Sequence, residues 1–115
     1  MIENPTEEQK RRLKGIIYLI INNITGQKYV GKASDTFLRR YTKKWWRYAS
    51  SRYFRNSIDT YGHENFSISF IEHGILDPIE LGDLEIKYIK EMNCLFPNGY
   101  NFILDGDPIE VTDEY

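Results

Sequence analysis

Apolar residues cluster early in the chain in the way that β-strands require. Residues 15–22 (GIIYLIIN) combine β-branched and aromatic side chains without polar alternation, which predicts a strand buried on both faces. The polar stretch NNITGQ follows, and residues 28–32 (KYVGK) form a second short β-type run. Together the two runs predict a β-hairpin with a glycine-containing loop.

The segment after the hairpin begins with a helix signal. Ser34 or Asp35 can cap a helix that starts near Thr36. If that helix continues through Lys44, a set of basic residues falls on one face at a spacing of four. The set is Arg39, Lys43 and, one turn later, Arg47.

Another helix and a third strand are expected in the middle of the chain. The helix covers residues 51–60, because Tyr61-Gly62 supplies the glycine that commonly ends helices. Residues 66–72 (FSISFIE) then alternate between apolar and polar positions with a period of two, which predicts a strand. Its apolar face carries Phe66, Ile68 and Phe70.

A carboxylate and a proline mark the start of the last helix. Asp77 can cap the free backbone N–H groups, and Pro78 fits the first helical position. Apolar residues then recur at helical spacing before the Pro97-Asn98-Gly99 turn. They are Leu81, Leu84, Tyr88 and Met92.

The predicted order β-β-α-α-β-α favours an α+β fold, with a small antiparallel three-stranded sheet flanked by helices. We expect this domain to span residues 15–104. For residues 1–14, which are polar and charged, two interpretations stay open: a short helix from Thr6, or an arm that becomes ordered on contact with a partner. Residues 105–115 form an acidic tail that we expect to be disordered.

Composition narrows the class of protein. With 115 residues, 41% of them hydrophobic, the chain is long enough for one domain with its own core. No apolar run approaches the length of a membrane span, so we expect a soluble protein. Cys94 is the single cysteine, which excludes a disulfide framework or a cysteine-rich zinc site and fits a reducing compartment.

Basic residues are concentrated in one part of a chain whose net charge is -2. Between residues 28 and 56, nine basic residues accompany one acidic residue, a local charge of +8, so the remainder carries -10. Interleaved aromatics suit this block to a phosphate backbone and stacked bases; the alternative is a solvated helix surface whose aromatics fill the core. Besides Arg39, the block offers eight candidate nucleic-acid contacts: Lys28, Lys32, Arg40, Lys43, Lys44, Arg47, Arg52 and Arg55.

Glu85 lies near the middle of the apolar stripe of the last predicted helix, four residues after Leu81. A buried, unpaired carboxylate costs on the order of several kcal/mol, so a cation should compensate it. The candidates are Arg39, Lys87 or a bound metal. In the other interpretation, Glu85 lies at the edge of the stripe, reaches solvent and pairs with Lys87 or Arg12.

Two tyrosines, one in each hairpin run, lie 11 residues apart. Core packing explains either one taken alone. Across a hairpin, however, Tyr18 and Tyr29 can direct their hydroxyls to one point, and Gly31 permits a close approach. Arg39, in the first turns of the next helix, can reach back over the hairpin as a phosphate clamp.

These features occur in the same order in a known family. The series GIIYLI, KYVGKA, an arginine eight residues after Gly31, a helical glutamate in LEIKYIKEMN and a closing GYN resembles the GIY-YIG nuclease domain. The resemblance runs from about Gly15 to Asn101, although the first triplet reads IIY. The GYN ending is similar to the phage and mobile-element homing-endonuclease branch, whereas YVGKA also resembles the excision-repair version.

The resemblance implies a metal-dependent DNA endonuclease that hydrolyses phosphodiester bonds by a one-metal mechanism, so that residues 15–104 would be a catalytic domain. Tyr18 would position or deprotonate the attacking water, and Tyr29 would hydrogen-bond water or phosphate. Arg39 would stabilise the scissile phosphate, Glu85 would bind one Mg²⁺ or Mn²⁺, and Asn101 would support the site.

Two details of this chemistry stay open. A phenol with a reference pKa of about 10 is a poor base at neutral pH, so Tyr18 needs a metal or a cation such as Lys28 or Lys32 nearby. Many members of the family carry a histidine four residues after the arginine, where this chain has Lys43. Either the base role rests wholly on Tyr18, or Lys43 only contacts phosphate and the enzyme is slower.

The expected partner is double-stranded DNA, cut in the cytoplasm of a bacterial or phage-infected cell. Homing enzymes usually attach a separate DNA-targeting domain, so we expect an excised catalytic domain, a free-standing nuclease of low specificity or a homodimeric restriction-type enzyme. The alternative function is a catalytically inert nucleic-acid binding module of the same fold, although binding alone needs no carboxylate in a phosphate site. A protein-interaction domain is a third interpretation, in which neither nucleic acid nor metal matters.

Overall fold

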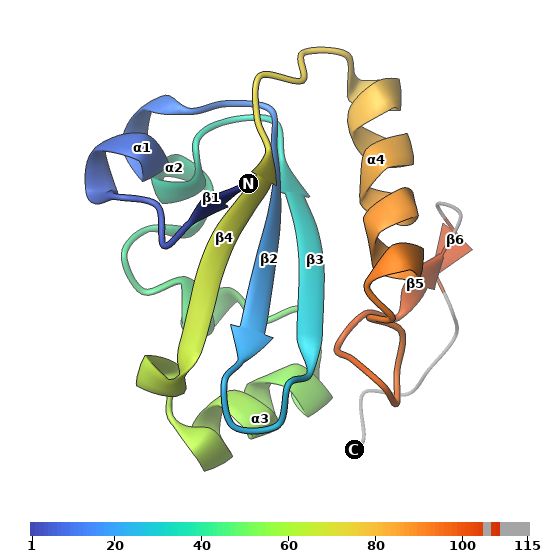
Figure 1. Cartoon of the computed structure of the whole chain (residues 1–115). Helices are drawn as coiled ribbons and strands as arrows, with labels where there is room; N and C mark the ends of the chain where they lie inside the picture. Colours follow the sequence, from blue (N-terminus) through green and yellow to red (C-terminus); the bar gives the residue numbers. More distant parts are fainter. Residues whose placement is uncertain (105–106, 109–115) are drawn as a thin grey trace.

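An antiparallel sheet with helices on both faces forms the centre of the computed structural model, which describes residues 1–104 and 107–108. In chain order the elements are β1 (Ile2–Glu3), α1 (Glu7–Arg12), β2 (Ile16–Asn22), β3 (Lys28–Ala33), α2 (Phe37–Tyr41), the 3₁₀ helix η1 (Trp45–Tyr48), α3 (Arg52–Tyr61), the 3₁₀ helix η2 (His63–Asn65), β4 (Phe66–Glu72), α4 (Pro78–Glu91), β5 (Ile103–Leu104) and β6 (Asp107–Pro108). The sheet order is β1-β4-β2-β3, and β5 pairs with β6 separately. Figure 1 shows α4 alongside the edge strand β3.

The predicted hairpin and third strand are confirmed. β2 pairs antiparallel with β3, so that Tyr18 lies opposite Gly31 and Ile20 opposite Tyr29. β4 pairs with the other side of β2, again antiparallel. Its apolar positions point to one face, as the alternation predicts, and join the same buried cluster: Phe66, Ile68 and Phe70.

The sheet has four strands in the described part of the chain, whereas the sequence predicts three. The additional strand is β1, whose Ile2 pairs with Phe70 of β4. A two-residue strand leaves no periodic signal, which is why the hydrophobic pattern misses it. The short helix expected near the N-terminus is present as α1, where Thr6 and Gln9 form a reciprocal capping box. Of the predicted acidic tail, residues 105–106 and 109–115 lie outside the described residues.

The helix after the hairpin does not continue to Lys44, so the predicted basic face is wrong. α2 ends at Tyr41, because Thr42 adopts a φ of 59° and turns the chain. Lys43 and Arg47 therefore do not continue the face on which Arg39 lies. The cap is also displaced, since Thr36 accepts the hydrogen bond from the backbone of Arg39.

The turn at Thr42 has a packing reason. It brings Trp45 of η1 over the core, where its ring lies 6.4 Å from that of Phe54 and 6.2 Å from that of Phe66. Burial of aromatic surface outweighs the small propensity gain from a longer helix. Helix propensity alone cannot report this contact, which joins residues far apart in sequence.

The other two helices begin and end as predicted. Ser51 caps α3 by accepting from the backbone of Phe54, and Gly62 ends it with a φ of 84°. Asp77 caps α4 by accepting from the backbone of Ile79, with Pro78 in the first turn. No helix within residues 1–104 or 107–108 is long and apolar enough to span a membrane.

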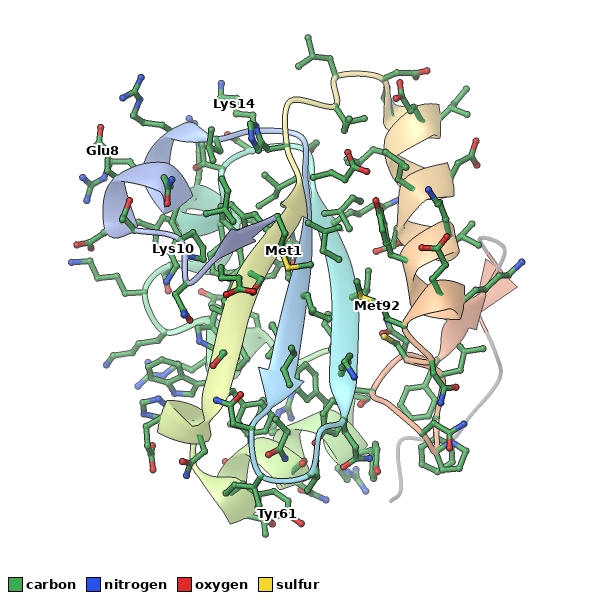
Figure 2. All side chains as sticks on the ribbon, viewed as in Figure 1. Met1, Glu8, Lys10, Lys14, Tyr61 and Met92 are labelled. Atoms are coloured by element: carbon green, nitrogen blue, oxygen red, sulfur yellow. The ribbon has the colours of Figure 1, made fainter. Side chains whose placement is uncertain are left out.

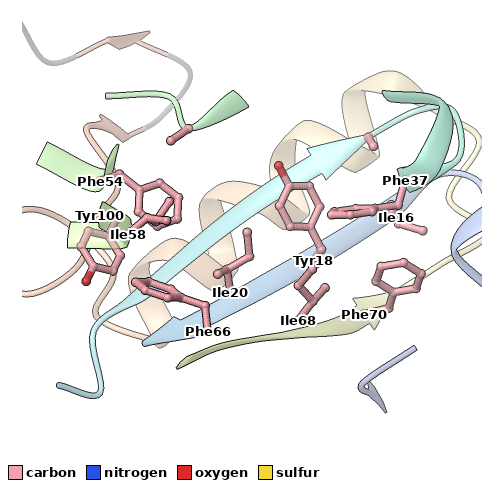
Figure 3. Close-up of a cluster of buried hydrophobic side chains, with 12 residues drawn as sticks. Ile16, Tyr18, Ile20, Phe37, Phe54, Ile58, Phe66, Ile68, Phe70 and Tyr100 are labelled. Atoms are coloured by element: carbon pink, nitrogen blue, oxygen red, sulfur yellow. The ribbon is translucent and has the colours of Figure 1, made fainter. Parts of the chain in front are cut away.

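Alternation along β2 gives the sheet two different buried faces. The aromatic face packs beneath α2 and α3 (Figure 3) and buries Ile16, Tyr18, Ile20, Ala33, Phe37, Ala49, Phe54, Ile58, Phe66, Ile68, Phe70 and Tyr100. The aliphatic face packs against α4 and buries Ile17, Leu19, Val30, Leu81, Ile89 and Cys94. Figure 2 shows Met92 between α4 and the sheet, where it covers this second cluster.

Candidate active site

Tyr18 and Gly31 are cross-strand partners, and their pairing explains the glycine. The Tyr18 side chain is only 3% exposed, and its ring crosses β3 at Gly31, where there is no side chain (Figure 3). A Cβ atom on Gly31 would lie 2.3 Å from the Tyr18 hydroxyl, far inside normal contact distance. Because the φ of Gly31 is not positive, the requirement is for space and not for an unusual backbone conformation.

Three phenols converge above this point. The Tyr18 hydroxyl donates to that of Tyr41 at 2.6 Å, and the rings of Tyr18 and Tyr29 lie 6.2 Å apart. Tyr29 also hydrogen-bonds with Tyr18 and Ser50. The structure thus brings together the two tyrosines that the sequence singles out. Tyr41 was missed, although its spacing of four from the buried Phe37 marks the inward face of α2.

Burial keeps the hairpin phenols neutral. It raises the pKa of Tyr18 well above its ordinary value, with further increases from Tyr29, Tyr41 and the charge of Glu85. Burial also raises the pKa of Tyr29 to about 12, although its hydrogen bond with Ser50 acts in the opposite direction. At neutral pH both groups are therefore hydrogen-bonding phenols and not phenolates.

Glu85 lies on α4 and is half-buried. Desolvation raises the pKa of its carboxyl, and the nearby Lys32 ammonium partly opposes that shift. The cation beside Glu85 is thus Lys32, which was not among the predicted partners. Because Glu85 raises the pKa of both Tyr18 and Tyr29, the three groups form one electrostatic unit across the edge strand β3.

The strand register separates the hairpin lysines from the tyrosines. Lys32 pairs with Ile17 and Lys28 with Ile21, so both lysines belong to the aliphatic face of the sheet. Tyr18 belongs to the aromatic face. The causes that raise the pKa of Tyr18 are burial, the neighbouring phenols and Glu85, so a cationic field from Lys28 or Lys32 stays a prediction.

The donor set near Glu85 is compatible with a hard divalent cation. No group of three or more His, Cys, Asp or Glu side chains gathers among residues 1–104 and 107–108, which argues against a closed zinc site there. Mg²⁺, in contrast, is usually held by one or two carboxylates together with water and substrate phosphates. A bound cation would also offset the cost of burying the Glu85 carboxylate.

Cys94 is no alternative nucleophile, since burial raises the pKa of its thiol to about 11.

A cavity of about 320 Å³ opens beside the tyrosines. Tyr18 and Tyr29 form part of its wall, and of the predicted nucleic-acid contacts it gathers Arg40, Arg47 and Arg55. The remaining basic candidates do not line it: Lys28, Lys32, Arg39, Lys43, Lys44 and Arg52. The predicted basic block is therefore divided between a concave site and the surrounding surface.

Arg39 lies outside this cavity and is 79% exposed. Its Nε lies 3.3 Å from Oδ2 of Asp35, four residues earlier, which fixes one edge of the guanidinium. Lys43 pairs with Glu7 of α1, with Nζ 2.7 Å from Oε1. Neither Arg39 nor Lys43 lines the cavity beside the phenols.

The closing GYN segment is tied to the edge strand. Asn101 is buried, and its side-chain amide accepts from the Val30 N–H at 2.9 Å and donates to the Val30 carbonyl at 2.8 Å. Tyr100 enters the aromatic core, where its hydroxyl accepts from Asn22 at 3.1 Å. Gly99 has no room for a side chain, because a Cβ atom would lie 2.4 Å from the Cys94 carbonyl oxygen. Asn101 thus holds the backbone of Val30, which lies between Tyr29 and Gly31 in β3.

Two solved structures are similar to this chain. The chain is 30% identical to the catalytic domain of intron endonuclease I-TevI, determined as a point mutant; the match covers 78% of this chain and 94% of that one, with a TM-score of 0.65. A second structure, described as the catalytic domain of homing endonuclease I-TevI, matches at 30% identity over 78% and 99% of the two chains, with a TM-score of 0.64. No protein-family model matches the sequence, and no curated protein matches it significantly.

Proposed function

Because this chain belongs to the GIY-YIG nuclease family, we propose that it is a DNA endonuclease that hydrolyses phosphodiester bonds with the help of one divalent metal ion. The observation that carries the proposal is the convergence of Tyr18, Tyr29 and Tyr41 over Gly31, beside an arginine-lined cavity. The relatives are described as intron and homing endonucleases, which supports double-stranded DNA as the substrate class.

Tyr18 orients the attacking water as a neutral phenol. When the water oxygen bonds to phosphorus, its proton passes to the Tyr18 oxygen, and Tyr18 gives its own proton to Tyr41, to which it already donates. Tyr41 lines the cavity and can release a proton to solvent there. This relay avoids a free phenolate, which the raised pKa of Tyr18 disfavours.

Arg39 and Glu85 stabilise the charge that develops on the phosphate. The contact between Arg39 and Asp35 uses Nε, so the two terminal nitrogens of the guanidinium can donate side by side to phosphate oxygens. Glu85 would hold Mg²⁺ or Mn²⁺, which when bound neutralises phosphate charge and stabilises the departing 3′ oxygen. Tyr29 donates a hydrogen bond to the water or to the phosphate.

One such centre cuts one strand in each encounter. We therefore propose nicked DNA as the primary product. A double-strand break would require a homodimer, or a separate DNA-targeting domain that holds the protein on its site for a second cut.

The proposal is tested by nicking of supercoiled plasmid with Mg²⁺ and with EDTA. Glu85→Gln keeps the size of the side chain but removes the charge, and we expect a loss of about 10²-fold to 10³-fold in rate, the range for removal of one electrostatic group. Glu80→Gln is the matched control, because Glu80 is exposed on the same helix. It should nick like the wild type.

The alternative is the inert nucleic-acid binding module. It predicts DNA binding that weakens with salt but no metal-dependent change in plasmid topology. That result with the folded protein would overturn the nuclease proposal. Equal nicking by the Glu85 and Glu80 variants would instead remove Glu85 from the mechanism.

A further inference from the structure

The cavity beside the tyrosines has the size of one nucleotide and not of a duplex. At about 320 Å³ it lies at the lower end of the range of roughly 300–1,000 Å³ for small-molecule sites. A base pair within a stacked helix cannot enter such a space. A single nucleotide can, provided that it leaves the stack.

The walls match the two chemically different parts of a nucleotide. Tyr41, Trp45 and Tyr48 contribute aromatic surface, while Arg40, Arg47 and Arg55 contribute positive charge. Sites for single-stranded nucleic acid combine these elements, because aromatic rings stack on bases of any sequence and cations bind the backbone. Trp45 and Tyr48 belong to η1, whose short helical turn places both rings at the cavity.

Both kinds of group are available to a ligand. Tyr48 is a large aromatic residue that is 50% exposed, although it lies against the Tyr41 ring at 6.2 Å. Within residues 1–104 and 107–108, none of the ion pairs involves Arg40, Arg47 or Arg55. Arg40 lies over the Tyr41 ring at 5.1 Å and Arg55 donates to the Ala49 carbonyl at 3.4 Å, so the three arginines hold no carboxylate that a phosphate would have to displace. Arg39 and Lys43, outside the cavity, both have carboxylate partners.

We propose that this cavity binds one unstacked nucleotide adjacent to the scissile phosphate, so that the preferred substrate is DNA with an unpaired or flexible nucleotide at the cut. The inference rests on the proposed function for the position of the cut, but the binding of the nucleotide is independent of turnover. The base lies against the rings of η1, and its phosphate contacts the arginines.

The two tryptophans of the chain allow a direct test. Trp46 stacks on His63, with ring centroids 3.7 Å apart, and does not line the cavity. Trp46→Phe keeps a ring there and leaves Trp45 as the single tryptophan, so that emission excited selectively from tryptophan reports on the cavity wall. This protein is titrated in EDTA with a six-nucleotide single strand of thymidines and, separately, with a blunt hairpin in which the same six thymidines are paired and G·C pairs keep the stem closed.

We expect a saturable change in Trp45 emission with the single strand and at least ten-fold weaker binding of the duplex. Tyr48→Ala and Arg47→Gln should each weaken binding of the single strand about ten-fold. Lys14→Gln is the control, since it removes an exposed charge that neither lines the cavity nor belongs to the basic block, and it should weaken binding about two-fold at most.

Three results would overturn the inference. They are equal affinity for single strand and duplex, a Tyr48→Ala variant that binds like Lys14→Gln, and displacement of the strand by inorganic phosphate as effectively as by thymidine monophosphate. Plasmid nicking, measured separately, distinguishes the two proposals. Metal-dependent nicking together with any of these three results would refute only the nucleotide site, and selective binding of single strands without nicking would refute only the nuclease.

Discussion

The two faces of the sheet differ in chemistry although they share the same strands. The aliphatic face against α4 is closed by Ile17, Leu19 and Val30, whose side chains carry no polar atom. The aromatic face carries Tyr18 and Tyr29 among its rings and leaves a cavity next to them. One face therefore accounts mainly for stability, and the other combines stability with chemistry.

Glu85 connects the two faces. It belongs to α4, the helix of the aliphatic face, yet its charge reaches Tyr18 and Tyr29 on the other side. This is feasible because β3 is an edge strand and Gly31 leaves the edge uncovered by a side chain. In the proposed function, Glu85 would therefore act together with the tyrosines around the edge of the sheet, and the core stays closed.

The largest effect is expected on the aliphatic face, where a core substitution should lower stability but not the nicking rate. Leu19→Ala removes a side chain that is 3% exposed and should lower the free energy of unfolding by about 2–5 kcal/mol. Nicking per folded molecule should stay at the wild-type rate. Urea denaturation followed by plasmid nicking well below the midpoint measures both quantities. A rate loss greater than the unfolded fraction would mean that the faces are not separable.

The next largest effect is expected on the aromatic face, where substitutions should slow nicking strongly and lower stability only slightly. Tyr18→Phe and Tyr41→Phe each break the 2.6 Å hydrogen bond of the relay, and each should slow nicking about 10²-fold, within the range for general acid–base groups. Stability should fall by only about 1 kcal/mol, the net value of one hydrogen bond. Tyr88→Phe is the control, because its hydroxyl donates to Glu72 on α4's side of the sheet. Single-turnover nicking rates decide the comparison, and a full rate for Tyr41→Phe would exclude the relay.

A smaller effect is expected at Asn101, where one substitution should lower both stability and the nicking rate. Asn101→Ala leaves the N–H and carbonyl of Val30 without their side-chain partner, at a cost of about 1–3 kcal/mol in stability. Nicking should also weaken, because the strand segment that loosens carries Tyr29 and Gly31. Asn101→Asp can still accept from the N–H, but it places a buried carboxylate oxygen against the Val30 carbonyl, so at neutral pH it should cost more stability than Asn101→Ala. Hydrogen exchange of the Val30 amide measures the loosening, and wild-type protection in Asn101→Ala would contradict it.

The smallest effect is a dependence of stability on pH. The folded-state pKa of Glu85 is raised above its ordinary value of 4.5, so the folded protein holds this proton more tightly than the unfolded chain. Stability should therefore fall as pH rises from about 4.5 through the raised pKa, and Glu85→Gln should lack this component. Thermal unfolding of both proteins across this pH range measures the difference. Parallel curves for the two proteins would show that burial of Glu85 carries no such cost, and added Mg²⁺ should reduce the cost in the wild type alone.

Elements defined by signals from neighbouring residues were predictable. The hairpin, α3 with its Ser51 cap, β4 and α4 with its Asp77 start follow from alternation, caps and glycine stops. The length of α2 was not predictable, because the turn at Thr42 that ends it allows Trp45 to pack against Phe54 and Phe66 in the core. The pairing of β1 was also hidden, since two residues form no pattern.

For the site, the sequence by itself determined which groups are available: two hairpin tyrosines, a helical glutamate, a closing asparagine and a block of basic and aromatic residues. Only the tertiary structure decided which of them meet. It added Tyr41 to the phenols, placed Lys32 beside Glu85, and selected three arginines for the cavity. The physical reason is the distance along the sequence over which each interaction acts. Strand periodicity and helix caps act over a few residues, whereas the hydrogen bond between Tyr18 and Tyr41 spans 23 positions and exists only when α2 has packed onto the sheet.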